Sequence, residues 1–267
     1  MAESQQISED DQNWIEKHTE RMNGRNIPFT SAIHVYFDYR PLGAGKKPTT
    51  IHQIYFWPPA DQDQQRRLIM ETKLGAAKAK WKMTAAYETL RMLLVTLNQT
   101  SRISRIVGLG LGSLDYLNPY SEESQCRTIA RSYIQLAIIF VIQEELNNGT
   151  KLFLQDPAYG DNEINFVTRA GPPGPVDVTN DPNAFNLIDE ETILFSIGNH
   201  SSFWYPIEKG PMPTAIITDH LETCEKGGPI LKPQENLLKK YKAQEIAPKG
   251  TEGLGVHCAT KFWTSCN

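Results

Sequence analysis

Short apolar runs alternate with stretches of helical periodicity in the second half of the chain, and this alternation constrains the fold more than any other feature. Four runs have the length of buried strands, and a long helical stretch separates the first two. The runs span residues 103–108, 151–155, 192–196 and 213–218, and the helical stretch spans residues 121–146. Strands joined through helices form β-α-β units with parallel pairing. The sequence therefore predicts an α/β fold, a three-layer Rossmann-like sandwich with a mostly parallel sheet.

The first hundred residues carry a different pattern. β-branched and aromatic runs at residues 32–37 and 51–57 flank a segment rich in Gly, Pro and Lys at residues 41–48, which is typical of two strands joined by a loop. Acidic residues after Ser8 favour a helix that ends near Gly24, and apolar spacing predicts further helices over residues 61–97. We expect an N-terminal helix and β-hairpin extension that packs on the main domain.

The remaining segments complete the predicted organisation. We expect a proline-rich loop over residues 170–182, an amphipathic helix over residues 232–242 and coil from residue 247 onward. The chain then divides into a disordered tail, an N-terminal unit, a Rossmann-type domain and a C-terminal tail. These four parts span residues 1–10, 11–100, 101–246 and 247–267.

The charge balance and the N-terminus restrict partners and compartment. The 267 residues contain 27 Lys and Arg against 31 Asp and Glu, a net charge of −4, which does not favour nucleic acid as a partner. The N-terminus lacks the pattern of a secretory signal, and the longest apolar run, residues 136–142, is too short to cross a bilayer. We expect a cytoplasmic protein without membrane contact, and the nucleus stays open as a second location.

The cysteines and histidines near the C-terminus do not predict a metal site. His220 and Cys224 are four residues apart, and His257, Cys258 and Cys266 follow near the tail. Structural zinc sites show closely spaced ligand pairs on both sides, and this chain has no C-x-x-C pair. We therefore expect free thiols and no bound metal.

The run Gly108-Leu-Gly110-Leu-Gly112-Ser113 follows a predicted strand. Glycines at this place allow a tight turn and let the backbone approach a nucleotide or S-adenosylmethionine, so Gly108, Gly110, Gly112 and Ser113 are candidate ligand-binding residues. The strict dinucleotide pattern requires Gly or Ala where this chain has Ser113. The alternative is a glycine turn that only lets the strand and the helix pack closely.

Asp156 ends the next predicted strand and is a candidate for binding ribose hydroxyl groups. It lies 48 residues after Gly108, more than twice the usual separation of about 20 residues, so this role requires the long helical connection. A carboxylate at a polar rim is expected to contribute little to fold stability. The alternative is that Asp156 and Pro157 only begin a turn.

Two later strands also end in polar residues. Asn199 and His200 follow one of these strands, and Asp219 follows the other. Because parallel strands bring their carboxyl ends to one edge, we expect Gly110, Asp156 and His200 to converge on a pocket for a small nucleotide-like ligand. The alternative for His200 is a structural role, since no nucleophile or second base stands beside it.

The order of these motifs is similar to that of the SRR-like domain family, named for a plant "sensitivity to red light reduced" protein, in a divergent form of the kind found in fungi. The similarity covers about residues 80–222 and rests on five short motifs. These are Ile106-Val-Gly-Leu-Gly110, residues 133–137, residues 153–157 with Glu163 after them, residues 194–196 with His200 after them, and residues 215–217. Where the family commonly shows Pro-His-Cys and Gly-Asn, this chain has Asn199-His200-Ser201 and Thr218-Asp219.

The resemblance implies a regulatory protein, in a family linked to light and circadian signalling, microtubule stability and haem synthesis, with no established reaction. Two hypotheses follow. In the first, the chain is a regulatory or interaction protein with protein partners, and it binds a small ligand at the carboxyl edge of the sheet. In the second, it is an enzyme that uses S-adenosylmethionine or a nucleotide, similar to a methyltransferase. The sequence favours the regulatory hypothesis, because Ile106 and Val107 stand where methyltransferases usually carry an acidic residue. The sequence specifies neither a cofactor nor a set of catalytic residues.

Overall fold

The computed structural model describes most of the chain outside the termini and several connecting segments. The described residues are 9–24, 30–38, 49–57, 63–115, 122–146, 149–171, 176–198, 203–219, 221–222, 230–248 and 259–266. The expected disordered tail and the loop at residues 41–48 lie wholly or largely outside these ranges.

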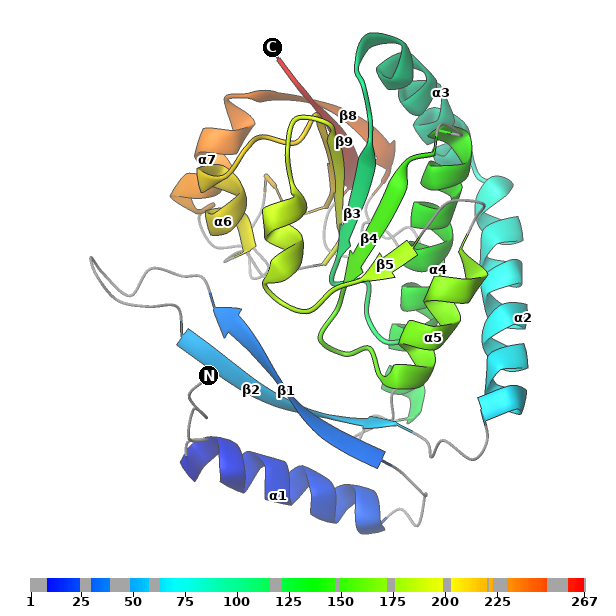
Figure 1. Cartoon of the computed structure of the whole chain (residues 1–267), viewed down its shortest axis with the longest axis vertical. Helices are drawn as coiled ribbons and strands as arrows, with labels where there is room; N and C mark the ends of the chain where they lie inside the picture. Colours follow the sequence, from blue (N-terminus) through cyan, green and yellow to red (C-terminus); the bar gives the residue numbers. More distant parts are fainter. Residues whose placement is uncertain are drawn as a thin grey trace.

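A seven-stranded sheet forms the centre of the molecule (Figure 1). The strand order is β5-β4-β3-β6-β7-β9-β8, in which the first five strands are parallel and the last two pair antiparallel. The strands are β3 (Arg105–Leu109), β4 (Lys151–Gln155), β5 (Val176–Val178), β6 (Thr192–Ser196), β7 (Ala215–Thr218), β8 (Tyr241–Ala247) and β9 (Thr260–Ser265). The predicted α/β sandwich with a mostly parallel sheet is confirmed.

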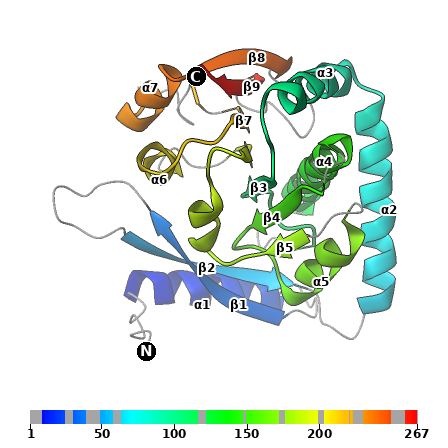
Figure 2. The same ribbon diagram turned by 45° about the horizontal axis from the view of Figure 1, so that its top comes forward.

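Helices cover both faces of this sheet (Figure 2). One face carries α2 (Asp63–Lys82), α3 (Ala85–Thr100), α4 (Glu122–Leu146) and α5 (Asp161–Ala170), and the other carries the shorter η2 (Asn183–Leu187), α6 (Trp204–Lys209) and α7 (Lys232–Leu238). Side chains of successive strand residues point to opposite faces. Ile106 accordingly packs in the cluster under α2 to α5, while Val107 packs in the cluster under η2, α6 and α7.

Helix α4 is the most deeply buried of these helices. Its residues 136–142 are all at most 1% exposed, because the sheet covers one side of the helix while α2 and α3 pack on the other. A helix that is apolar on all sides can be stable only when other elements surround it.

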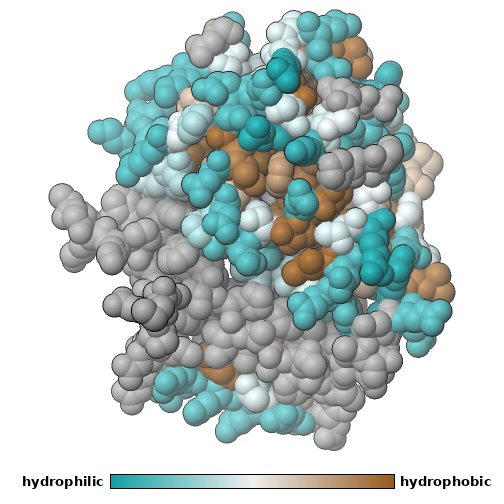
Figure 3. Space-filling view, in the orientation of Figure 1, coloured by the Kyte–Doolittle hydropathy of each residue, from teal (hydrophilic) through white to brown (hydrophobic). Residues whose placement is uncertain are grey.

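The layer of short helices η2, α6 and α7 covers its face of the sheet only in part. Apolar side chains from β4, η2 and α7 and from the segments on either side of α6 are only partly buried, and Figure 3 shows apolar surface on this face. The partly buried residues are Phe153, Phe185, Leu187, Phe203, Met212 and Leu238.

The N-terminal elements form a separate unit beside the sheet. Helix α1 (Glu9–Gly24) packs on a two-stranded antiparallel hairpin of β1 (Thr30–Asp38) and β2 (Thr49–Trp57). Arg66, at the start of α2, pairs with Asp115 in the loop after β3, so the chain enters the main domain at the carboxyl edge of the sheet. In Figure 1 the hairpin lies on that side of the sheet.

Three predictions of local structure were wrong. The segment 170–182 contains strand β5, which pairs with β4; the expected helix 232–242 ends at Leu238 and gives way to β8; and the expected coil after residue 247 contains β9. Strand β8 has four consecutive exposed residues, 242–245, so it lacks the apolar alternation that identifies a strand. Its pairing with β9 stabilises the extended conformation despite this weak local preference. The domain boundaries at residues 101 and 246 stay a prediction.

No helix among the described residues combines the length and the apolar character needed to cross a membrane. Cys126 and Cys266 are free and exposed. The other residues considered for a metal site, His220, Cys224, His257 and Cys258, lie outside the described residues.

Candidate functional site

The carboxyl edge of the sheet gathers most of the candidate residues. Gly110, Gly112 and Ser113 follow β3, Asp156 follows β4 and Asp219 follows β7. Since β3, β4, β6 and β7 are parallel neighbours, these residues share one edge. Asn199 and His200 lie outside the described residues, so the convergence of His200 with Gly110 and Asp156 stays a prediction.

Gly108 lies inside β3 and packs against α4. A Cβ atom on Gly108 would lie 2.4 Å from Ile139 Cδ1 and 2.9 Å from Leu154 Cδ2. These distances are shorter than van der Waals contact between carbon atoms. The structure therefore supports a packing role for Gly108, as the alternative in the sequence analysis proposed.

Gly110 and Gly112 form the turn that leaves the strand. Their φ angles are 66° and 81°, a region that residues with a Cβ atom rarely adopt. The N–H of Gly110 donates to the Gln155 carbonyl at 2.9 Å, and a Cβ atom on Gly112 would lie 2.4 Å from Ser132 Oγ. Both glycines are thus needed to pass the chain between β4 and α4.

The Asp156 carboxylate ties this turn to the end of β4. Its Oδ2 accepts a hydrogen bond from the Gly112 N–H at 2.6 Å, and its Oδ1 accepts one from the Ala158 N–H at 2.8 Å. Burial raises the pKa of Asp156, and the two backbone hydrogen bonds oppose that rise. The expected position at a polar rim is therefore wrong, because the Asp156 carboxylate is buried and holds the loop; ribose binding stays a prediction.

Glu163 makes the equivalent connection for the next residues of the loop. Its Oε1 accepts hydrogen bonds from Ser113 Oγ at 2.6 Å and from the Leu114 N–H, and its Oε2 accepts one from the Gly160 N–H at 2.8 Å. The carboxyl group is 1% exposed, and burial raises its pKa to about 7 although all three hydrogen bonds lower it. In the sequence, Glu163 stood out only as part of the family resemblance.

The loop after β3 therefore directs its backbone donors to the protein itself. The N–H groups of Gly110, Gly112 and Leu114 all bind oxygen atoms of the segment 155–163. A glycine-rich loop that cradles phosphate presents such N–H groups to the ligand. Here the carboxyl groups of Asp156 and Glu163 accept hydrogen bonds from two of these donors, so side chains of the chain itself hold the loop.

Arg131 on α4 supplies a cationic group at the same edge. A Cβ atom on Gly198 would lie 2.0 Å from Arg131 Nη2, so the guanidinium lies directly against the Gly198 backbone at the end of β6. Gly198 has a φ of 74°, and its N–H donates to Asp219 Oδ1 at 2.9 Å. With its amide oxygen toward Arg131, Gln135 accepts from Nε at 3.0 Å. This arrangement places Arg131 between the loop after β3 and the end of β6.

The Arg131 guanidinium is mostly desolvated. Burial lowers its pKa, and the nearby negative charge of Asp219 opposes that change. Within the described part of the chain, its Nη2 atom is buried and has no hydrogen-bond partner. Arg131 was not predicted from the sequence, although a charged residue within the apolar turns of the long helix is a signal that identifies such a group.

Comparison with known proteins identifies the family of the chain. One solved structure, the SAH-bound methyltransferase PaMTH1 from Podospora anserina, aligns over the full length of both chains with 11% identity and a TM-score of 0.38, values that bear on neither fold nor activity. No curated protein matches the sequence. The family model of the SRR1 domain matches residues 77–251. Because this match covers well over half of the 267 residues, the chain belongs to the SRR1-domain family that its motifs resemble.

Proposed function

We propose that this protein is a regulatory protein whose SRR1 domain binds a small ligand at the carboxyl edge of the sheet and communicates with protein partners. Membership of the SRR1-domain family supports the regulatory role. The observation that carries the ligand site is the Nη2 atom of Arg131, which is buried and lacks a hydrogen-bond partner among the described residues.

An unsatisfied donor on a buried guanidinium costs free energy. Leaving a buried polar group without a partner costs about 1–3 kcal/mol, and more for a charged group. Such groups are rare in folded proteins, and a bound ion, ligand or water commonly accounts for them. A ligand that places an acceptor beside Nη2 would recover this free energy. Arg131 therefore favours the binding of such a ligand at the carboxyl edge.

The surroundings of Arg131 restrict the ligand. The negative charge of Asp219 lies close enough to raise the pKa of Arg131, so it compensates part of the positive charge at this edge. The ligand therefore needs an acceptor for Arg131 but no large negative charge. A nucleotide-like molecule that presents a ring nitrogen, a carbonyl or a single carboxylate satisfies this requirement.

The geometry of the loop after β3 gives less support to the enzyme hypothesis than to the regulatory one. Its cofactor would use the loop after β3, where the N–H groups of Gly110, Gly112 and Leu114 already bind the chain itself. The regulatory hypothesis requires only that ligand binding at the edge change the surface offered to partners. The partly exposed aromatic residues Phe153, Phe185 and Phe203 on the η2 face are candidates for that surface.

Thermal unfolding with and without added ligand tests this proposal. S-adenosylmethionine and adenosine are the probes, because a ligand at 100 times its dissociation constant stabilises a fold by about 2.7 kcal/mol. We expect one probe to raise the unfolding temperature of the unmodified protein. Arg131→Gln should abolish that rise, and Arg131→Lys should weaken it, because lysine lacks the planar donor pair.

Arg127→Gln is the matched control. Arg127 lies one turn earlier on α4 and is exposed, so its replacement should leave the ligand response intact. A ligand response that is equal in the Arg131→Gln variant and the unmodified protein would contradict the proposed site.

A further inference from the structure

A polar cavity of about 790 Å³ lies at the amino-terminal edge of the sheet, opposite the candidate site. It forms where the chain enters β3, β4 and β6, because parallel pairing aligns Arg105 with both Lys151 and Thr192. The end of α3 adds Asn98 and Ser101 to its wall. Small-molecule sites have volumes of about 300–1,000 Å³, so the cavity can hold a metabolite.

The lining of this cavity is positively charged in a chain of negative net charge. Arg102, Arg105 and Lys151 line it against the single carboxylate of Glu191. Three cations and one carboxylate therefore line the cavity, while the whole chain has a net charge of −4.

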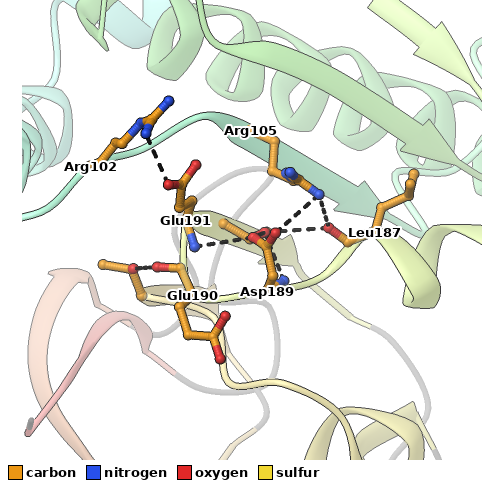
Figure 4. A network of polar contacts seen from close by, with 8 residues as sticks. Arg102, Arg105, Leu187, Asp189, Glu190 and Glu191 are labelled. Carbon is orange, nitrogen blue, oxygen red and sulfur yellow. Dashed lines mark hydrogen bonds and ion pairs between the residues drawn. The ribbon is translucent and has the colours of Figure 1, made fainter.

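Arg105 is a fixed part of the wall. Its Nη1 donates to the Leu187 carbonyl at 3.1 Å and lies 3.2 Å from Asp189 Oδ2 (Figure 4). Asp189 also accepts hydrogen bonds from Thr192 Oγ1 at 2.8 Å and from the Glu191 N–H at 3.1 Å. This network fixes the segment before β6 as one side of the cavity.

Arg102 and Lys151 are the cations free to meet a ligand. The Arg102 side chain is 84% exposed, and its Nε lies 3.5 Å from Glu191 Oε1. Exposed ion pairs of this kind contribute only about 0–1 kcal/mol, so Arg102 can exchange this partner for a ligand at little cost. Lys151 is exposed and forms no ion pair with any residue that the structure describes.

Ser104 supplies a rigid neutral donor. Its N–H donates to the Glu191 carbonyl at 3.0 Å, and its carbonyl accepts from the Lys151 N–H at 3.0 Å, so its backbone is held from both neighbouring strands. Its Oγ atom is buried and has no hydrogen-bond partner among the described residues. A buried hydroxyl group in a polar cavity indicates an acceptor that the protein itself does not provide.

From these observations we infer that the cavity binds a phosphorylated small molecule. Phosphate oxygens are acceptors only, and Arg102 and Lys151 are two cations that can turn toward a phosphate dianion. Ser104 Oγ donates to one oxygen, while Lys151 and Arg102 neutralise the charge. Phe153, which also lines the cavity, offers an apolar surface to the organic part of the ligand. This site is separate from the carboxyl edge and does not depend on the function proposed above.

Titration of the full chain with sodium pyrophosphate at constant ionic strength tests this inference. Calorimetry gives the dissociation constant, and amide resonances locate the site. We expect the resonances of Ser104, Gly149 and Lys151 to shift, while those of Gly110 and Gly112 remain in place. Failure to bind pyrophosphate up to about 10 mM would overturn the inference.

Substitutions in the cavity distinguish a specific phosphate site from general electrostatic attraction of pyrophosphate. Lys151→Gln combined with Arg102→Gln should weaken the dissociation constant about tenfold or more, because both charge-assisted contacts are lost. Ser104→Ala should weaken it about threefold, the loss expected for one neutral hydrogen bond. The matched control is Lys242→Gln on β8, an exposed lysine on a strand that four other strands separate from β4.

The control and the Arg131→Gln variant should both bind pyrophosphate like the unmodified protein. Equal weakening in Lys242→Gln and in Lys151→Gln with Arg102→Gln would contradict a specific site. Loss of pyrophosphate binding in Arg131→Gln alone would place the phosphate at the carboxyl edge and would also overturn the inference.

Discussion

The carboxylate of Asp156 accepts a hydrogen bond from the backbone N–H of Gly112 at 2.6 Å, across 44 positions of sequence. The contact joins the end of β4 to the turn after β3, at the place where related α/β folds bind ligands. Glu163 makes a parallel connection through Ser113 and Leu114. Two internal carboxyl groups thus hold the glycine-rich loop.

Replacing Asp156 with asparagine should lower the free energy of unfolding by about 1–3 kcal/mol. Each carboxylate oxygen accepts a backbone N–H, and an asparagine would place its own amide donor against one of them. Urea denaturation measures the loss. Asp161→Asn, at an exposed position in the first turn of α5, is the control and should cost less than about 1 kcal/mol. Similar losses in the two variants would show that Asp156 does not hold the loop.

Replacing Gly112 with alanine should destabilise the protein by about 1–3 kcal/mol. The backbone φ of 81° is strained for any residue with a Cβ atom, and that atom would meet Ser132 Oγ. Gly75→Ala is a control of opposite sign. A Cβ atom on Gly75 meets nothing within 4 Å, so in the interior of α2 alanine should stabilise by roughly 0.5–1 kcal/mol. Thermal denaturation of both variants measures whether each substitution lowers or raises stability. A Gly112→Ala variant as stable as the unmodified protein would contradict the prediction.

The stability of the protein should fall as the pH rises from 4.5 to about 7, through the titration of Glu163. Burial raises the folded-state pKa of this group above its ordinary value of 4.5, so in this range the folded state binds the proton more tightly than the unfolded state. The contribution of the protonated group is complete below pH 4.5 and is lost as the pH rises through the folded-state pKa.

Urea denaturation at several pH values measures this effect. The slope should reach up to about 1.4 kcal/mol per pH unit for one group. Glu163→Gln removes the titration and should flatten the profile between these pH values. Parallel profiles for the variant and the unmodified protein would exclude Glu163 as the titrating group.

Replacing Gly108 with alanine should cost about 1–3 kcal/mol through overpacking against α4. The new methyl group would lie 2.4 Å from Ile139 Cδ1. Ile139→Val removes that atom and by itself should cost about 0.5–1.5 kcal/mol. We expect the double variant to be more stable than the sum of the two losses predicts, with Leu154 limiting the rescue. Strict additivity in the double-mutant cycle would show that the contact does not decide the cost.

The central strands and the long helix of this fold could be predicted from local sequence. Their apolar runs are buried on both faces, so nearly every residue in them had to be hydrophobic, and the runs stood out clearly. The carboxyl edge followed from the same pattern, since parallel strands end on one side. Strands β5, β8 and β9 could not be found this way, because β5 has only three residues and β8 exposes most of its side chains.

The sequence by itself determined the α/β class, the order of the central elements and the family to which the chain belongs. The tertiary structure decided what the individual residues do. Gly108 packs under Ile139, Asp156 and Glu163 hold the loop, and Arg131 reaches Gly198. These contacts join residues from 31 to 67 positions apart. Local patterns report which face of an element is buried, whereas such contacts depend on how the elements pack against one another, which no single segment encodes.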